Sequence, residues 1–374
     1  MLKKSKNILL RIIFFAFALL SLVSCERQKD RIRRANEEIM TASAKYEESQ
    51  TTEIATDATY VIEETEESVE TEEIEETEET IERVEITFDS EKAKEEREKR
   101  RRNLESKADQ DGITDMKISM DMSFPFATYS VINDGSATLY MVGKNVPNYK
   151  GIIVTVNAGH GTKNGSRYKT YSHPDFSPKV AGGSTAVGEV YSYAVSEGTT
   201  FIGGIKEADA NLMIALLLKE KLLNDGYSVL MIREDNECRL DNIARTVLAN
   251  EYSDAHVSIH FDTTAINKGV FYVKPINVES YLNMEPLKSN YENIIKLGQS
   301  ILDGYRSIGV KIWKESGMLE GDLTQLSYSI IPSVDIELGD RASEFTEEII
   351  NKLVDGLKLG IDIFFTSNSE TQSE

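Results

Sequence analysis

The sequence predicts an α/β fold in which a largely parallel sheet carries helices on both faces. From Gly151 onwards, short apolar runs of strand length alternate with longer segments whose apolar residues recur at helical spacing. Polar side chains follow several of the short runs, and open sheets of this kind bind ligands beyond the carboxyl ends of their strands. The expected strands are Ile152–Val156, Ser228–Ile232, Val257–Ile259, Val270–Val273, Val310–Trp313 and Ser333–Ile336. The expected helices are Asn211–Leu223, Leu240–Glu251, Tyr291–Tyr305 and Glu344–Phe364.

Residues 1–25 are expected to be a targeting segment that is not part of the fold. A positive region precedes the apolar run Ile12–Leu20, which is too short for an ordinary membrane-spanning helix. The segment ends in Leu22-Val23-Ser24-Cys25, which resembles the lipobox of bacterial lipoproteins, where the cysteine becomes the acylated N-terminus. We therefore expect a signal peptide and a protein anchored by lipid on Cys25 to the extracytoplasmic face of the cell membrane. The alternative is an uncleaved N-terminal anchor, and in both cases the rest of the chain is exported.

Residues 26–110 are expected to form a disordered, charged linker. The stretch 51–89 has sixteen acidic residues and one basic residue, and so carries −15 of the chain's net charge of −21. Glu91–Ser106 is dense in Glu, Lys and Arg without an apolar stripe, so a helix there would be solvated. We interpret this acidic tether as a spacer between membrane and domain. The alternative is a docking arm for a regulatory protein partner, which the sequence does not identify.

Residues 111–150 are expected to be a short β lead-in to a catalytic domain at 151–366, with a polar tail at 367–374. Alternating stretches flank Asn133-Asp134-Gly135, which is a turn signal. The sequence has no basic patch interleaved with aromatic residues, so nucleic acid is not an expected partner. If Cys25 is acylated, Cys238 has no partner, which excludes a disulfide framework and leaves it as a small apolar side chain.

Four side chains carry the expected chemistry. His160, His260 and Glu337 stand at the ends of three predicted strands, so the topology delivers two imidazoles and a carboxylate to one sheet edge. Glu207 opens the first long helix after a glycine-rich loop. Two histidines and a carboxylate around an open position are typical of a catalytic zinc site. We therefore expect His160, Glu207 and His260 to bind one Zn²⁺ per chain, and Glu337 to act as the general acid–base.

The other two histidines are expected to have different roles. His256 lies in the same strand as His260 but about 13 Å from it, so one ion cannot bind both. We therefore expect His256 to be structural. His173 follows in a long loop and is expected at the surface or at the edge of the substrate site.

Three charged residues in these motifs also have ordinary interpretations. Glu207 could be a routine partner of the helix dipole, because acids are common at helix starts, and nearby Asp209 could be confused with it. Arg245 follows Asp241 by four residues within a predicted helix, so an ion pair between them is expected. Arg233 and Arg245 could instead clamp substrate, and we leave both outside the predicted site.

The same residues lie in motifs that resemble the zinc-dependent N-acetylmuramoyl-L-alanine amidases of the amidase_3 type, over roughly Gly151 to Phe365. In order, the motifs are Gly159-His160-Gly161, Lys206–Leu212, Arg233 with Asp235, Leu240, Arg245, Ala249-Asn250, Ser258-Ile259-His260 and Ile331-Pro332-Ser333 before Glu337. The resemblance implies a twisted, mixed sheet of about six strands. It also implies zinc on His160, Glu207 and His260, with Glu337 as the catalytic acid–base. The implied reaction is hydrolysis of the amide between N-acetylmuramic acid and L-alanine in peptidoglycan.

The sequence departs from the family's pattern in three positions and one insertion. Asn157-Ala158 replaces Asp-Pro before the first histidine, and Asp262 replaces Asn two residues after the second. None of these is a ligand, but each affects hydrogen bonding around a metal, and Asp262 adds negative charge there. The stretch 163–205 contains Tyr168, Tyr171, Tyr191 and Tyr193. It is either a mobile flap over a glycan groove or an ordinary surface insertion.

Two further functions are compatible with the sequence. The departures and the long tether would also suit a non-catalytic cell-wall-binding or regulatory lipoprotein on an amidase scaffold. The same zinc chemistry would suit a peptidase that cuts within the stem peptide, because only the groove would differ.

Overall fold

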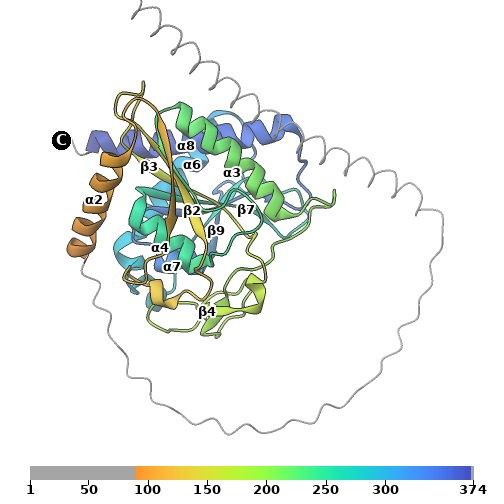
Figure 1. The fold of residues 1–374 in the computed structure, drawn as a ribbon. Helices are drawn as coiled ribbons and strands as arrows, with labels where there is room; N and C mark the ends of the chain where they lie inside the picture. The colour runs from red at the N-terminus through yellow and green to blue at the C-terminus, as the bar shows by residue number, and fades with distance from the viewer. Residues whose placement is uncertain (1–89, 372–374) are drawn as a thin grey trace, which may run out of the picture. The chain divides into compact units, whose positions relative to one another are not determined.

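A computed structural model describes residues 90–371, and its central feature is an eight-stranded mixed sheet (Figure 1). The strands are β1 (Ile113–Ser119), β2 (Ser136–Val142), β3 (Ile153–Ala158), β6 (Ser228–Met231), β7 (Ala255–Asp262), β8 (Phe271–Pro275), β9 (Met318–Gly321) and β10 (Ser333–Asp340). A separate two-stranded ribbon consists of β4 (Lys169–Tyr171) and β5 (Tyr191–Tyr193). The helices are α2 (Ser90–Lys107), α3 (Glu207–Asn224), α4 (Asn242–Tyr252), α5 (Glu279–Leu282), α6 (Leu287–Ser307), α7 (Thr324–Tyr328) and α8 (Glu347–Thr371). The predicted targeting segment, the acidic stretch and the last three residues of the tail lie outside the described residues.

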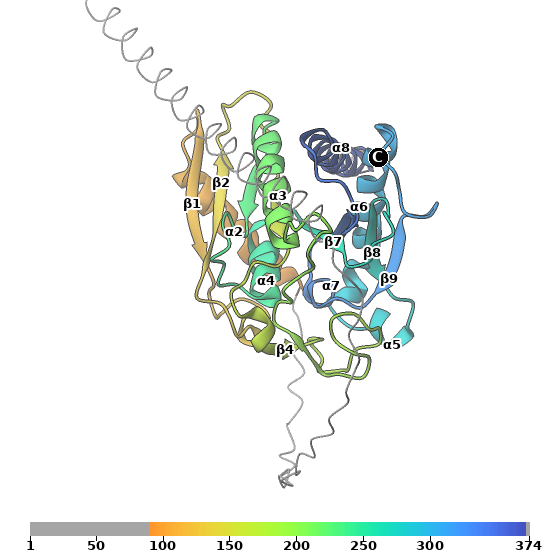
Figure 2. The same ribbon diagram turned by 90° about the vertical axis from the view of Figure 1, so that its right-hand side faces the viewer.

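The centre of the sheet is parallel and carries helices on both faces. The strand order is β1-β2-β6-β3-β7-β10-β8-β9, in which β6, β3, β7 and β10 run parallel to one another. From β3 the chain moves outward to β6 and then crosses back to β7, so right-handed crossovers place α3 and α4 on opposite faces. Helix α8 packs against α3 and α6, whereas α4 packs against α2 and α7 (Figure 2). The predicted α/β architecture is confirmed.

Apolar side chains explain why these segments fold together. All six residues of β3 are buried, as expected for a parallel strand covered on both faces. On one face, Ile153 of β3 and Leu230 of β6 pack against Leu248 of α4. Leu139 of β2 belongs to the same cluster, so the predicted β lead-in is an integral part of the sheet.

The sheet differs from the prediction in its size and at one strand. It has eight strands where about six were expected, because β1 and β2 extend one edge. The prediction of a strand at Val310–Trp313 is wrong: Ile312 forms only an isolated bridge with Val270. The chain then turns through Lys314 and Gly317, which both have positive φ, and the strand begins at Met318.

The prediction of a disordered linker is wrong for residues 90–110, because α2 docks on the domain. This helix has no apolar stripe, and its arginines make most of the specific contacts. Arg100 pairs with the buried carboxylate of Glu251, and Arg101 donates to both carboxylate oxygens of Asp254 at 2.8 and 2.9 Å. Charge complementarity with α4 and the loop after it therefore orders a segment that hydrophobicity alone would leave in solvent. None of the helices between residues 90 and 371 is both long and apolar enough to cross a membrane.

The Arg101→Ala substitution is expected to lower the free energy of unfolding by about 1–2 kcal/mol, because Asp254 loses two charge-assisted hydrogen bonds. Urea denaturation measures this change. Arg102→Ala is the matched control: the neighbouring side chain is 68% exposed and pairs only with Glu98 on the solvent side. The control should change stability by less than about 0.5 kcal/mol. Equal effects of the two substitutions would contradict the docking role of α2.

Candidate metal centre

The topology gathers the four predicted side chains at one edge of the sheet. Strands β3, β7 and β10 are adjacent and parallel, so their carboxyl ends lie together. His160 follows β3, His260 lies in β7, and Glu337 occupies the position in β10 that pairs with His260. Glu207 is the first residue of α3. All four line one cavity of about 440 Å³.

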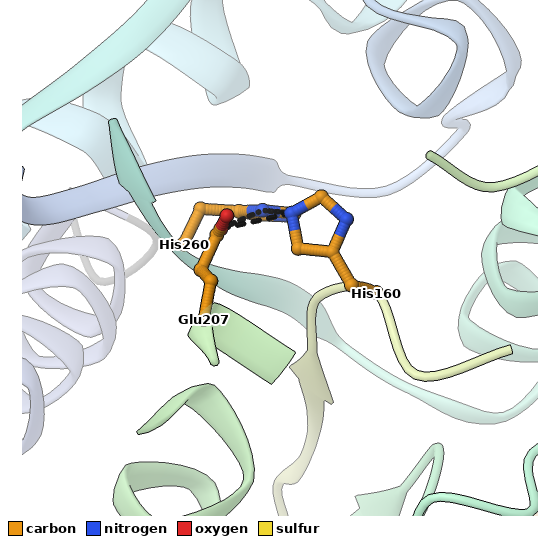
Figure 3. A group of neighbouring side chains, drawn as sticks. All are labelled: His160, Glu207 and His260. Atoms are coloured by element: carbon orange, nitrogen blue, oxygen red, sulfur yellow. Dashed lines mark hydrogen bonds and ion pairs between the residues drawn. The ribbon is translucent and has the colours of Figure 1, made fainter. Parts of the chain in front are cut away.

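His160, Glu207 and His260 point their donor atoms at one another (Figure 3). His160 Nε2 lies 2.8 Å from Glu207 Oε1 and 3.1 Å from His260 Nδ1. His260 Nδ1 lies 3.2 Å from the same Glu207 oxygen. Ligands of a tetrahedral zinc ion with bonds of about 2.1 Å are separated by roughly 3.4 Å. The triangle formed by His160 Nε2, Glu207 Oε1 and His260 Nδ1 therefore has nearly the dimensions that one such ion requires.

Hydrogen bonds on the outer side of the triangle fix the orientation of its members. His160 Nδ1 donates to the carbonyl oxygen of Ser196 at 2.8 Å. Because a carbonyl only accepts, the lone pair of a neutral His160 ring is on Nε2, inside the triangle. The backbone N–H groups of Thr199 and Phe261 donate to Glu207 Oε2 and Oε1 at 2.8 and 3.1 Å. Such outer contacts are typical of metal ligands.

The three donor residues and the nearby carboxyl groups of Asp335 and Glu337 form a cluster with an excess of acidic groups, which favours a cation. Burial alone would raise the pKa of Glu207, but His160 and His260 hold it well below its usual range. Burial would lower the pKa of His260, but the carboxylates of Asp335, Glu207 and Glu337 raise it to about 9. Burial also raises the pKa values of Asp335 and Glu337. A divalent cation at the triangle would compensate these carboxylates.

The backbone around His160 adopts an uncommon conformation. His160 and Gly161 both lie in the left-handed region, with φ of 61° and 76°. The His260 ring packs directly against Gly159, where an added Cβ would lie 2.1 Å from the ring carbon Cε1. Glycine is therefore required at Gly159 by the close approach of the His260 ring, and at Gly161 by its positive φ and the neighbouring Arg233 guanidinium. A non-glycine residue with positive φ such as His160 must be held by its surroundings.

Arg245 is one of the groups that hold this loop, and the predicted ion pair with Asp241 is wrong. Asp241 instead accepts the N–H of Ala244 at the start of α4. Arg245 is 1% exposed and donates to the carbonyl oxygen of His160 at 2.7 Å. All five of its N–H groups have acceptors. These are the carbonyl oxygens of Leu240, Ala158 and His160, Asn157 Oδ1 and Thr162 Oγ1.

Arg233 holds the same loop from the other side. It donates to the carbonyl oxygens of Ala158 and Gly159, each at 2.9 Å. It also donates to the carbonyl oxygen of Ala208, in the first turn of α3, which ties the Glu207 helix to the His160 loop. Burial lowers its pKa to about 9, so the guanidinium remains charged at neutral pH. Both arginines are therefore structural supports of the cluster, a role that their sequence spacing did not indicate.

The departures from the family's motifs are accommodated by specific partners. Asn157 Oδ1 accepts from Arg245 at 3.1 Å, and its Nδ2 faces His256 Nε2 at 3.2 Å. Asp262 pairs with Lys268 and accepts from Thr264 Oγ1 at 2.7 Å. The extra negative charge expected from Asp262 is therefore compensated by its own lysine.

The two remaining histidines lie outside the triangle. His256 is fully buried, and burial lowers its pKa to about 3, so it is neutral and structural as predicted. Of the two positions expected for His173, the surface is wrong, because the side chain is 1% exposed. A position at the edge of the site agrees with its contact to Asp322, which lines the cavity. His173 Nε2 lies 2.8 Å from Asp322 Oδ1 and its Nδ1 lies 2.8 Å from Ser177 Oγ. This contact joins the 163–205 stretch to the end of β9.

Asp335 is a cavity residue that sequence reasoning missed. Its Oδ2 lies 3.6 Å from His260 Nε2, on the side of the ring opposite the triangle. It precedes Glu337 by two residues in β10, so both carboxylates share one face of the strand and both line the cavity. The signal was present in Val334-Asp335-Ile336-Glu337, where acidic residues alternate with apolar ones in a buried strand.

The 163–205 stretch forms one wall of the cavity. Lys179, Thr185, Ser192 and Tyr193 line the cavity together with the residues at the strand ends. The wall includes the β4–β5 ribbon, which lies apart from the main sheet (Figure 1). The stretch is therefore part of the site, and the interpretation as an ordinary surface insertion is not supported.

Comparison with known proteins identifies similar chains. Residues 154–360 match the family model described as N-acetylmuramoyl-L-alanine amidase. The N-acetylmuramyl-L-alanine amidase Ami1 from Mycobacterium smegmatis is 20% identical, with 59% of this chain and 99% of that chain covered and a TM-score of 0.48. Ami1 from Mycobacterium abscessus is 22% identical, with 57% and 99% covered and a TM-score of 0.45. An N-acetylmuramoyl-L-alanine amidase from Clostridium difficile 630 is 20% identical, with 59% and 99% covered and a TM-score of 0.40. No curated protein sequence matches the chain.

The Glu207→Gln substitution is expected to weaken zinc binding at least about tenfold, because a neutral amide replaces the one anionic donor of the triangle. Titration against a chromogenic chelator measures the affinity. Asp209→Asn is the matched control: Asp209 lies in the same helical turn but accepts from Asn236, outside the triangle. Loss of zinc from the Asp209 variant, with wild-type affinity in the Glu207 variant, would contradict the assignment.

Proposed function

The chain belongs to the N-acetylmuramoyl-L-alanine amidase family, and we propose that it works with one zinc ion held by His160, Glu207 and His260 and with Glu337 as the catalytic acid–base. As a member of this family it is a peptidoglycan hydrolase that cuts the amide between N-acetylmuramic acid and L-alanine. The observation that carries the proposal is the triangle of three donor atoms within 3.2 Å of one another, in a cavity also lined by Glu337, whose buried Oε2 has no hydrogen-bond partner in the described part of the chain.

The donor set suits zinc in kind as well as in size. Two imidazole nitrogens and one carboxylate oxygen, with an open side toward a cavity, are the ligands of many catalytic zinc sites. A zinc ion bound there would polarise the scissile carbonyl and make water more acidic. The chain's part is to present the three donors in fixed orientations; Ser196 holds His160 in this way, and Thr199 and Phe261 hold Glu207.

Glu337 is suited to move a proton in this reaction. Its Oε2 is buried and has no hydrogen-bond partner among the described residues, so it is available to a substrate or water. Burial raises the pKa of this carboxyl well above its usual value, with Asp335 and Glu207 adding to the shift. A carboxylate with a raised pKa accepts a proton from the attacking water and returns it to the leaving amine nitrogen more readily.

Asp335 is placed to orient one ligand. Its carboxylate faces His260 Nε2, while His260 Nδ1 points into the triangle. A carboxylate behind a ligating imidazole fixes the ring and increases its basicity. We propose this supporting role for Asp335, whereas Glu337 faces the reaction.

Replacing Glu337 with Gln should lower kcat by about 10²- to 10⁴-fold, because the proton shuttle is lost. Zinc content should stay at about one per chain, because Glu337 is not in the triangle. Mass spectrometry of products from defined muropeptides measures the activity and locates the cut. Wild-type turnover by the variant would refute the mechanism.

The same product analysis separates the other interpretations. An amidase releases a stem peptide with a free L-alanine amino group and leaves the lactyl carboxylate on the sugar. A peptidase acting within the stem would give shorter peptides still attached to the sugar. A non-catalytic wall-binding protein would give no new product.

We also propose that the chain is a lipoprotein held to the cell membrane through Cys25. The support is in the sequence: a positive region, a short apolar run and Leu22-Val23-Ser24-Cys25, all outside the described residues. Several acyl chains on one cysteine anchor a protein stably. The domain would then act at the extracytoplasmic face, where its peptidoglycan substrate lies.

The Cys25→Ser variant should leave the membrane fraction and lose labelling by a fatty-acid analogue, because no other cysteine lies near the N-terminus. Cys238→Ala is the control: Cys238 is buried in the core between α4 and the sheet and should not affect anchoring. Membrane retention of the Cys25 variant would instead support an uncleaved N-terminal anchor.

A further inference from the structure

The β4–β5 ribbon presents an aromatic face that the proposed chemistry does not use. Its strands are antiparallel, with Lys169 opposite Tyr193 and Tyr171 opposite Tyr191. Side chains alternate along a strand, so these four share one face while Thr170 and Ser192 share the other. The second pair is buried, whereas Tyr191 and Tyr193 remain 43% and 39% exposed.

The rings of this face are held in place from behind. The Tyr171 and Tyr191 rings lie 4.8 Å apart, with their hydroxyl groups at 3.3 Å. Tyr171 also packs against Phe176 at 4.5 Å, and its carbonyl accepts from the hydroxyl of Tyr328 in α7. On the buried side, Ser192 exchanges a hydrogen bond of 2.7 Å with Ser172. The ribbon is therefore anchored to the domain, and its exposed rings are preorganised for contact with a ligand.

The aromatic face is continuous with the catalytic cavity. Of its four residues, Tyr193 lines the same cavity as His160, His260 and Glu337. The bond cleaved by the family joins a sugar to a peptide. When this amide lies at the His160–Glu207–His260 cluster, the glycan strand on one side of it must therefore extend along a wall of the cavity. Exposed aromatic groups clustered beside a site mark a binding surface, whereas scattered ones need no explanation.

The charge of the face suits a neutral polymer. Lys169 is the only charged side chain of the four, and it lies 4.0 Å from Glu189 and 5.8 Å from the Tyr193 ring. The face therefore has aromatic planes, phenol hydroxyls and little net charge. A chain of N-acetylated sugars offers the matching chemistry, since its rings have apolar C–H faces and polar edges. The charged stem peptide does not match this surface.

We infer that the face formed by Lys169, Tyr171, Tyr191 and Tyr193 is a binding subsite for the glycan strand of peptidoglycan, next to the sugar whose amide is cut. This inference rests on the proposed function, because it places the scissile amide at the His160–Glu207–His260 cluster. It makes the 163–205 stretch a determinant of glycan length preference.

The direct test measures binding of a neutral oligomer of N-acetylglucosamine to the Glu337→Gln protein by isothermal titration calorimetry. Adding Tyr191→Ala or Tyr193→Ala should weaken binding roughly two- to tenfold per ring, the range expected for one aromatic contact. Tyr191→Phe keeps the ring and should bind within about twofold of the parent. Circular dichroism verifies that each variant is folded.

Tyr168→Ala is the matched control, because it removes a phenol that is 52% exposed in the same insertion but lies outside the four-residue face. It should leave glycan binding and activity at wild-type values. Equal loss from Tyr168→Ala, or no loss from the Tyr191 and Tyr193 alanine variants, would overturn the inference.

Kinetics distinguishes this inference from the proposed function. With the Glu337 side chain intact, Tyr191→Ala should reduce kcat/KM on long glycan strands several-fold more than on a single disaccharide-peptide. An equal reduction on both substrates would overturn the subsite while leaving the amidase assignment in place. Glycan binding without amide cleavage by the wild-type protein would instead refute the catalytic mechanism and leave the subsite standing.

Discussion

The candidate metal site depends on two buried guanidinium groups that bind the backbone of one loop. Arg233 and Arg245 together donate to the carbonyl oxygens of Ala158, Gly159 and His160, and each uses all five of its N–H groups. Burying two cations without an acidic partner is costly unless every donor has an acceptor. The loop carbonyl groups that accept these hydrogen bonds are therefore held in place by the arginines. This exchange keeps His160 in a left-handed conformation that it would rarely adopt alone.

Positively and negatively charged side chains have different roles around this loop. The two arginines bind the carbonyl groups of the loop, while the carboxylates of Glu207, Asp335 and Glu337 line the cavity. The carboxylates raise the pKa of His260 to about 9, which shows that the cavity side attracts positive charge. The proposed metal ion and the proposed proton transfer would both use that field: the ion would offset the negative charge of the carboxylates, while burial would favour uptake of a proton by Glu337.

The parallel strands and the insertion contribute different parts of the site. Adjacent parallel strands β3, β7 and β10 place rigid donors at one edge, as doubly wound sheets commonly do. The 163–205 stretch adds the opposite wall and is tied down by the buried His173–Asp322 contact. The proposed reacting groups therefore lie on the central strands, whereas the 163–205 insertion shapes the wall of the cavity. An insertion anchored in this way can change specificity without moving the metal ligands.

The sequence by itself predicted the α/β class and the meeting of His160, Glu207, His260 and Glu337 at one sheet edge, because periodicity and strand-end position are local properties. It did not determine that Arg245 would bind the His160 loop instead of Asp241, that His173 would be buried, or that α2 would dock through Arg100 and Arg101. Each of these depends on partners more than a hundred residues away or across the fold. The alternation of acidic and apolar residues around Asp335 is visible in the sequence, but only the register of β10 against β7 places its carboxylate near His260. Long-range side-chain pairing is decided by how the strands and helices pack, so only the tertiary structure could supply it.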